Sequence, residues 1–279
     1  MRKFLTKILL NPRESEQTAR DWPDIPVSVF NLGSGSRGNC SLICNGDKSL
    51  MVDCGFSRRQ TMLRMNLLGL DPRAVCGILV SHEHGDHMKG AQKCSGDLGV
   101  PILGTNGTLT GWGLPSMNTR TLVYSDQVEH DGFSVTPVQI SHDTKEPCAF
   151  LIEVAGVRSL FATDIGTTKS LDLGLLGQLD FLYIEANHDD GMLRNSPYPI
   201  SVKNRIAGDG GHLSNQQCGR LIKTLASRSP NLRTIMLAHL SAKSNHPAKA
   251  LKTAQKNAGM LPGVKWQVAE QDRPTELMK

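Results

Sequence analysis

Short apolar segments separated by glycine- and proline-rich turns dominate the chain from residue 27 onward. Alternating apolar and polar positions, or a short apolar run between turn residues, are typical of strands, whereas apolar residues at helical spacing indicate amphipathic helices. The pattern predicts strands at 27–32, 41–44, 50–53, 77–80, 121–124, 133–140, 149–154, 159–163, 181–185, 234–239 and 264–268. It predicts helices at 57–68, 202–206, 214–226 and 247–257.

Strands and helices alternate in the second half of the chain, without a long linker or an internal repeat. This mixture predicts one α/β domain over residues 25–279, preceded by an extension over residues 1–24. The sequence contains no apolar run close to the ~20 residues that a membrane-spanning helix requires. The basic N-terminus has no cleavage site of a signal peptide, so we expect a cytoplasmic protein with no membrane partner.

Composition adds one asymmetry to this description. The chain is 39% hydrophobic and 20% charged, an ordinary globular composition that excludes a disordered or collagen-like chain. Its net charge is +5, but residues 191–279 carry 14 Lys and Arg against 4 Asp and Glu. This basic third is either a contact surface for a polyanion such as nucleic acid or an ordinary solvated surface. Nothing in the sequence indicates an oligomeric state.

Candidate chemistry is concentrated after the strand at 77–80, in Ser81-His-Glu-His-Gly-Asp-His87. Three imidazoles and two carboxylates lie within six residues of each other. Neutral imidazole and carboxylate are ligands of divalent transition metals, above all of zinc. Such a cluster is costly to bury unless a cation neutralises it, so the spacing favours a metal site over a histidine-rich surface loop.

The spacing His82-x-His84-x-Asp86-His87 resembles the signature of the metallo-β-lactamase superfamily. The resemblance implies a four-layer αββα sandwich of the α/β (α+β) class with two divalent metal ions. Further ligands are then expected at the ends of later strands, and the matching positions are His142, Asp164 and His239.

The roles of these ligands follow from the resemblance and from coordination chemistry. One ion would be held by His82, His84 and His142, the other by Asp86, His87 and His239, and Asp164 would bridge both. We expect zinc, with manganese or iron as alternatives. A metal-bridging hydroxide would be the nucleophile. Asp86 is predicted both as a metal ligand and as a catalytic residue.

Other blocks resemble the WalJ/YycJ family, a bacterial branch of phosphodiesterase type. They are Ser34-x-Ser36-x-Gly38-Asn39, Glu185-x-Asn187-His188-Asp189, Met192-Leu-Arg194-x-x-x-Tyr198-Pro199 and Gly211-His212-Leu-Ser214-Asn215. The resemblance covers about residues 27–250 and implies a 5′→3′ exonuclease that acts on DNA. With only 5% aromatic residues, binding would be directed mainly at phosphates and would be sensitive to salt.

The leaving oxygen requires a proton, and His212 is the first candidate for the general acid. It resembles a late histidine of ribonuclease Z-type enzymes that is not a metal ligand. The alternative is a purely structural His212. The pair His188 and Asp189 is the competing candidate for proton donation or for phosphate binding.

Two further groups of residues are candidates for substrate binding. Ser34, Ser36 and Asn39 could bind phosphate through a glycine-rich loop, or the loop could be a tight turn that only shapes the pocket. Ser214 and Asn215 could contact the scissile phosphate, or could cap the helix at 214–226.

Three classes of function are compatible with a metal site of this kind. The first is the nuclease just described. The second is a hydrolase of the same fold for a small phosphodiester, ester or lactone, because a fold does not determine a substrate. The third is a non-enzymatic binding protein, which the seven competent residues at the ligand positions disfavour.

Overall fold

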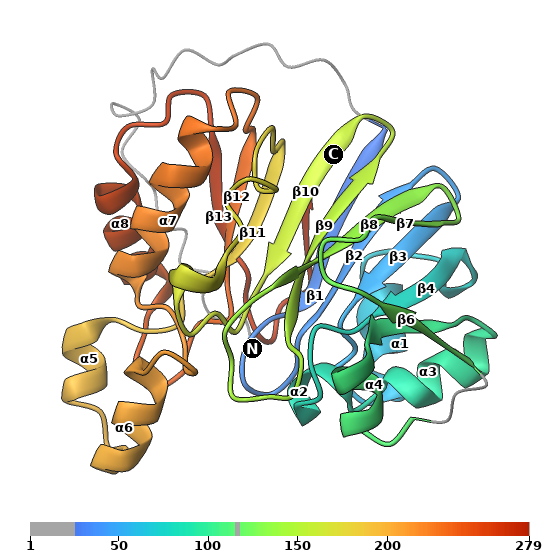
Figure 1. Cartoon of the computed structure of the whole chain (residues 1–279), viewed down its shortest axis with the longest axis horizontal. Coiled ribbons are helices and arrows are strands. Elements are labelled where there is room, and N and C mark those ends of the chain that lie inside the picture. Colours follow the sequence, from blue (N-terminus) through green and yellow to red (C-terminus); the bar gives the residue numbers. More distant parts are fainter. Residues whose placement is uncertain (1–25, 115–117, 279) are drawn as a thin grey trace, which may run out of the picture.

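In a computed structural model, residues 26–114 and 118–278 are described, and they form two facing β-sheets covered by helices (Figure 1). The predicted extension over residues 1–24 lies outside the described residues. The first sheet has the order β14-β1-β2-β3-β4-β5-β6. Its strands are β1 (Val27–Gly33), β2 (Cys40–Asn45), β3 (Lys48–Val52), β4 (Val75–Leu79), β5 (Ile102–Thr105), β6 (Thr119–Leu122) and β14 (Thr275–Met278).

The second sheet has the order β13-β12-β11-β10-β9-β8-β7. Its strands are β7 (Val128–His130), β8 (Phe133–Gln139), β9 (Cys148–Val154), β10 (Val157–Ala162), β11 (Phe181–Glu185), β12 (Thr234–Ala238) and β13 (Lys265–Val268). The helices are α1 (Arg58–Leu67), α2 (Gly85–Met88), α3 (Ala91–Leu98), α4 (Asn106–Gly111), α5 (Asp190–Arg194), α6 (Ile200–Ala207), α7 (Asn215–Ser227) and α8 (Pro247–Ala258).

Three hydrophobic cores separate four layers. Residues such as Ile43 and Phe150 fill the space between the two sheets. Met65 of α1 packs on the outer face of the first sheet, and Ile222 of α7 and Ala254 of α8 pack on the outer face of the second. Figure 1 shows α1, α3 and α4 on one side of the sandwich and α7 and α8 on the other. The four-layer αββα arrangement expected from the resemblance is therefore confirmed.

The strand directions determine where loop residues gather. In the first sheet β3, β4, β5 and β6 are parallel, and in the second sheet β10, β11, β12 and β13 are parallel. Strand β8 runs in the direction of β10, because each is antiparallel to β9. The carboxyl ends of parallel strands lie at one edge of a sheet, where α/β proteins place their sites.

The elements predicted from the hydrophobic pattern are present, and their ends differ by at most two residues from the structure. The prediction missed β5, β7, β14, α2, α3, α4 and α5. Strand β14 pairs with β1, although the two strands are almost 250 residues apart in the sequence. Local periodicity cannot predict such a contact. Among the described residues, no helix has the length and apolar character needed to cross a membrane.

Candidate metal centre

The residues predicted as metal ligands follow the carboxyl ends of four strands. His82 and His84 follow β4, and the one-turn helix α2 directly after them carries Asp86 and His87. The remaining three follow strands of the second sheet: His142 after β8, Asp164 after β10 and His239 after β12. The structure brings all seven together.

Two of these strand ends have an unusual backbone conformation. Asp164 has a φ of 57° and His239 a φ of 53°, and Asp53, at the end of β3, has a φ of 59°. The left-handed conformation costs a residue other than glycine of the order of 1–2 kcal/mol. At these positions the strained turn directs the side chain into the site at the sheet edge.

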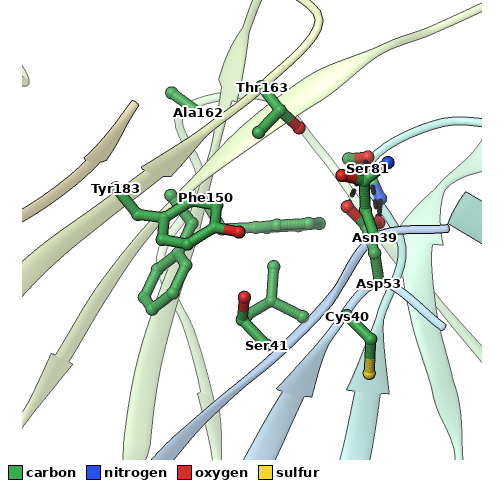
Figure 2. Close-up of a pocket in the computed structure, with 11 residues that line it drawn as sticks. Asn39, Cys40, Ser41, Asp53, Ser81, Phe150, Ala162, Thr163 and Tyr183 are labelled. Carbon is green, nitrogen blue, oxygen red and sulfur yellow. Dashed lines mark hydrogen bonds between the residues drawn. The ribbon is translucent and has the colours of Figure 1, made fainter. Parts of the chain in front are cut away.

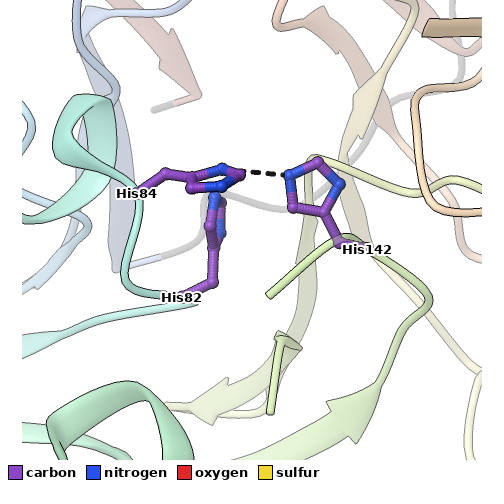
Figure 3. Close-up of side chains that lie close together, drawn as sticks. All are labelled: His82, His84 and His142. Atoms are coloured by element: carbon purple, nitrogen blue, oxygen red, sulfur yellow. Dashed lines mark hydrogen bonds between the residues drawn. The ribbon is translucent and has the colours of Figure 1, made fainter. Parts of the chain in front are cut away.

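The first group of possible ligands contains His82, His84 and His142 (Figure 3). One nitrogen of each ring lies within 4.8 Å of the others. Nε2 of His142 lies 3.2 Å from Nδ1 of His84, and Figure 3 shows these two rings meeting above His82. Three imidazole nitrogens that converge in this way match the donors of a zinc ion.

The second group contains Asp86, His87 and His239, again with one donor atom each within 4.8 Å of the others. The Oδ2 atom of Asp86 lies 3.6 Å from Nε2 of His87 and 3.6 Å from Nε2 of His239. Both histidine side chains are buried, whereas a quarter of the Asp86 side chain is exposed. Solvent therefore reaches the second group from the side of the carboxylate.

Asp164 lies between the two groups. Its carboxylate oxygens are 3.1 Å from Nε2 of His87, 3.8 Å from Nε2 of His142 and 3.5 Å from Nδ1 of His239. It also forms a possible ligand set with His82 and His87. A carboxylate has two oxygens, so one side chain at this position can reach donors of both groups.

Hydrogen bonds to the other ring nitrogen orient several of these histidines. Nδ1 of His87 donates to Oδ2 of Asp53 at 2.8 Å, and Nδ1 of His239 donates to Oε1 of Glu185 at 3.1 Å. Nδ1 of His142 donates to the carbonyl oxygen of Gly211 at 3.1 Å. These acceptors assign the proton to Nδ1 and leave the lone pair of Nε2 facing the cluster, as in metal-binding histidines.

Buried atoms without a hydrogen-bond partner provide a direct test of whether a metal fits. Nε2 of His82, Nε2 of His239 and Oδ2 of Asp164 are buried and accept no hydrogen bond within the described residues. Buried polar atoms are nearly always satisfied, and each exception requires an explanation. A divalent cation would satisfy all three, and the mixture of imidazole and carboxylate suits zinc, manganese or iron.

The charges of the cluster are strongly coupled. Burial lowers the pKa of His82 well below its ordinary value, and the neighbouring His87 lowers it further. Burial also disfavours charge on His239, but Asp164, Asp86 and Glu185 outweigh this effect and raise its pKa to about 10. Burial opposes ionisation of Asp164, yet His239 and His87 hold its pKa well below the ordinary value. Protons and metal ions would therefore compete for the same site.

His212 belongs to neither of these three-residue groups, but it forms a further set of possible ligands with Asp164, Glu185 and His239. Its Nδ1 donates to Oε1 of Glu185 at 2.8 Å, and its side chain is 21% exposed. Burial lowers the pKa of His212, but the carboxylate of Glu185 outweighs this effect and raises the pKa above its ordinary value. The pair thus presents an oriented imidazole at the rim of the site.

Two acidic residues support the cluster: sequence reasoning missed Asp53, and it named Glu185 only within a family block, without a role. Glu185 is fully buried, and His212 and His239 outweigh the effect of burial and lower its pKa to about 2. Asp53 accepts hydrogen bonds from His87 and from Ser81, and Figure 2 shows Asp53 and Ser81 together beside a small cavity between the sheets. The available signal was their position, because each is an acidic residue at the end of an apolar strand.

The glycine-rich loop after β1 touches the second group of ligands. The buried Ser34 accepts a hydrogen bond from the backbone N–H of His239 at 2.9 Å, and it donates to Oδ1 of Asn39. Nδ2 of Asn39 lies 3.0 Å from Nε2 of His87. Ser36 is exposed on the same loop. Ser34 and Asn39 thus have the contacts of a loop that shapes the pocket, and phosphate binding by this loop stays a prediction.

The four remaining predicted residues lie outside the groups of possible ligands. The buried His188 forms a backbone bridge with Ser214, and Asp189 caps α5 through the N–H of Met192. Ser214 caps α7 in a reciprocal capping box, and Asn215 is buried against Asn245. Ser214 therefore has the partners expected of a helix cap, which was the alternative to a contact with the scissile phosphate. Contacts of these four residues with substrate stay predictions.

Comparison with known proteins gives concordant results. Residues 48–239 match the sequence profile of the Beta-lactamase superfamily domain. The chain is 29% identical to the Exodeoxyribonuclease YycJ of Bacillus anthracis, across 77% of this chain and 82% of that protein. It is 29% identical to the Exodeoxyribonuclease WalJ of Streptococcus pneumoniae, across 77% and 81%. The structure resembles the metallo-β-lactamase fold protein YhfI from Bacillus subtilis with a TM-score of 0.66 at 17% identity, across 90% of this chain and 99% of that one.

Proposed function

The chain belongs to the beta-lactamase superfamily and is a metal-dependent hydrolase, and from this premise we propose that it is a binuclear exonuclease that degrades DNA. The observation that carries the proposal is the meeting of two three-donor groups at Asp164. The names of the YycJ and WalJ relatives support DNA as the substrate. The 5′→3′ direction rests on the family resemblance alone.

The ligand assignment follows the two groups. His82, His84 and His142 would hold one ion, Asp86, His87 and His239 would hold the other, and Asp164 would contact both. When bound at these residues, two divalent ions would supply Lewis-acid polarisation of a phosphodiester and would lower the pKa of water at the site. We propose zinc as the native metal, with manganese or iron as alternatives.

His212 is proposed as the proton donor to the leaving oxygen. Its Nδ1 proton is committed to Glu185, so Nε2 is the atom that can pass a proton to the substrate. The exposed fraction of the side chain, 21%, allows contact with a bound substrate, whereas the competing His188 is only 1% exposed. Burial thus favours His212 over His188 for this role.

The loop after β1 has a positioning role in this proposal. Ser34 holds the backbone of His239, and Asn39 lies between Ser34 and His87. Both side chains are occupied, and most backbone N–H groups of the loop already donate hydrogen bonds within the protein. The exposed Ser36 is therefore the group of this loop that is left for phosphate. The loop would therefore orient the second group of ligands and meet the substrate through Ser36.

The test is cleavage of end-labelled duplex DNA, single-stranded DNA and RNA by the purified protein with added zinc or manganese. We expect metal-dependent shortening from one end of DNA, and the position of the label gives the polarity. Asp86→Ala controls for contaminating nucleases and should abolish the signal. Absence of polymer cleavage with both metals bound would refute the nuclease and support a small phosphodiester, ester or lactone as the substrate.

A further inference from the structure

A polar groove is lined in part by the loops that carry Asp164 and His212, and it is not used by the mechanism proposed above. Its volume is about 450 Å³. It lies between the loop after β10 and helix α7, and its polar lining includes Thr167, Thr168, Lys169, Asp209, Arg220 and Thr224.

The walls of the groove belong to the same loops as residues of the site. Thr167 follows Asp164 by three residues, and Asp209 precedes His212 by three residues. The two walls touch near the metal centre, because a Cβ atom on Gly166 would lie 2.1 Å from the carbonyl oxygen of Asp209. Ser141, next to His142, accepts a hydrogen bond from the N–H of Gly166 and donates one to the same carbonyl. A substrate strand that leaves the site across this contact would reach the groove.

The charges of the groove suit an anionic chain. It presents the cations of Lys169 and Arg220 against the single carboxylate of Asp209. The Lys169 ammonium lies 3.7 Å from that carboxylate, but both side chains are more than three quarters exposed. Such a pair contributes about 0–1 kcal/mol, so a phosphate can replace it. Arg220 is exposed and has no ion pair with any described residue.

The lining also indicates which part of a nucleic acid would lie there. Its neutral polar groups are mainly threonine hydroxyls, and no aromatic side chain lines the groove. Bases are bound by stacking on aromatic rings, whereas hydroxyls, lysine and arginine contact phosphate and sugar. The contact would therefore be independent of the base sequence.

A second groove lies on the other side of the site and has a different character. It is lined by Ser34, Arg37, His246, Glu270 and Asp272, among others. Arg37 is already paired with Asp272, and Glu270 adds a further carboxylate. This groove is thus neutral to acidic and would repel a phosphate chain. The asymmetry favours the groove of Lys169 and Arg220.

We propose that this groove binds the sugar-phosphate backbone of a single nucleic-acid strand next to the scissile phosphate, through Lys169 and Arg220. The inference rests on the proposed nuclease function and adds a binding site to it. Neither residue belongs to the ligand groups or to the proton-donor pair, so their loss should weaken binding of a polymer and leave the chemistry of a small diester intact.

The experiment compares the double variant Lys169→Ala/Arg220→Ala with the metal-loaded wild type on a single-stranded oligonucleotide and on bis(p-nitrophenyl) phosphate. We expect KM for the oligonucleotide to rise at least about tenfold. The slope of log(kcat/KM) against log salt should fall by about 1.4, which is two single-strand phosphate contacts at about 0.7 each. Hydrolysis of the small diester should stay within about twofold of wild type.

Two further variants make the result specific. Arg59→Ala/Lys93→Ala removes two exposed cations from α1 and α3, on the other side of the sandwich, and should behave as wild type. Lys169→Arg/Arg220→Lys keeps both charges and should retain most of the binding.

The possible failures are distinguishable. If the wild type cleaves DNA and the double alanine variant shows the KM and salt slope of the control, the groove proposal is wrong and the nuclease stands. An equal loss on both substrates would also overturn it, because the two residues would then act on the site itself. If the wild type hydrolyses the small diester but no nucleic acid, both proposals fail together.

Discussion

At the scale of single residues, candidate ligand positions could be proposed from the sequence because their chemistry is restrictive. Few residue types bind a transition metal, and their spacing in His82–His87 leaves little ambiguity. Asp53 and Glu185 carry no such spacing, since a lone acidic residue after a strand is common. Their function depends on contacts with His87 and His212, which are 34 and 27 residues away in the chain, and only the folded structure shows these contacts.

The first prediction concerns the carboxylate between the two groups. Asp164→Ala should reduce the bound metal from two ions per chain to one or fewer, because it removes a donor within reach of both groups. Elemental analysis of the dialysed protein measures this stoichiometry. Asp209→Ala, which removes an exposed carboxylate of the neighbouring loop, is the matched control and should keep both ions. Two retained ions in the Asp164 variant would rule out a bridging role.

The second prediction separates proton transfer from metal binding. His212→Ala should keep both metals and lower kcat on DNA by about 10²–10⁴, the usual contribution of a general acid. The loss should be smaller for a substrate with a good leaving group such as p-nitrophenolate, which needs no proton. Steady-state kinetics on the two substrates, together with metal analysis, test this. Loss of metal from the variant would instead give His212 a structural role.

At the scale of elements, periodicity found the strands and helices with a clear apolar pattern and missed the segment between α2 and β6. That segment contains short elements such as α4 (Asn106–Gly111), whose sequence is Asn-Gly-Thr-Leu-Thr-Gly. Glycine and threonine have weak helix propensity, so tertiary packing determines this helix. Its sequence has no apolar periodicity from which the helix could be predicted. For α7, by contrast, an apolar face and a capping box indicate the same element.

The third prediction concerns the contact between α7 and α8. A Cβ atom on Gly219 would lie 2.5 Å from the carbonyl oxygen of Ala254, and a backbone atom cannot move aside cheaply. Gly219→Ala should therefore lower the free energy of unfolding by about 1–3 kcal/mol.

Gly96 in α3 is the matched control, because a Cβ atom there meets nothing within 4 Å. Gly96→Ala should raise the free energy of unfolding by up to about 1 kcal/mol, the difference in helix propensity. Urea denaturation of both variants measures the two changes. Equal effects in the same direction would show that close packing at Gly219 is not the cause.

At the scale of the whole molecule, the resemblance predicted the four layers and the sheet edge that carries the site. The return of the chain to the first sheet through β14 was not predictable, because its pairing with β1 joins residues 29 and 278. The candidate ligands come from both halves: His82–His87 follow β4 of the first sheet, and His142, Asp164 and His239 follow strands of the second. Metal binding should thus stabilise the docking of one half on the other.

The fourth prediction tests this coupling. Removal of metal with a chelator should lower the melting temperature, and added zinc should restore it, because a ligand bound only by the folded state stabilises that state. At a free metal concentration 1,000 times Kd the gain is about 4 kcal/mol per ion. Differential scanning fluorimetry with and without chelator measures the shift. Asp164→Ala should respond much less, and an unchanged wild-type melting temperature would contradict the coupling.

The division of the ligands between the two sheets has a consequence for the life of the protein in a cell. Each donor set is incomplete until both halves of the sandwich have come together, so neither half can assemble the proposed centre alone. The proposed centre would therefore form only when both halves of the sandwich are folded and docked. A chain that is still being synthesised, or that has lost one half to proteolysis, contains no competent centre. For an enzyme proposed to degrade DNA, such fragments and folding intermediates should then lack nuclease activity.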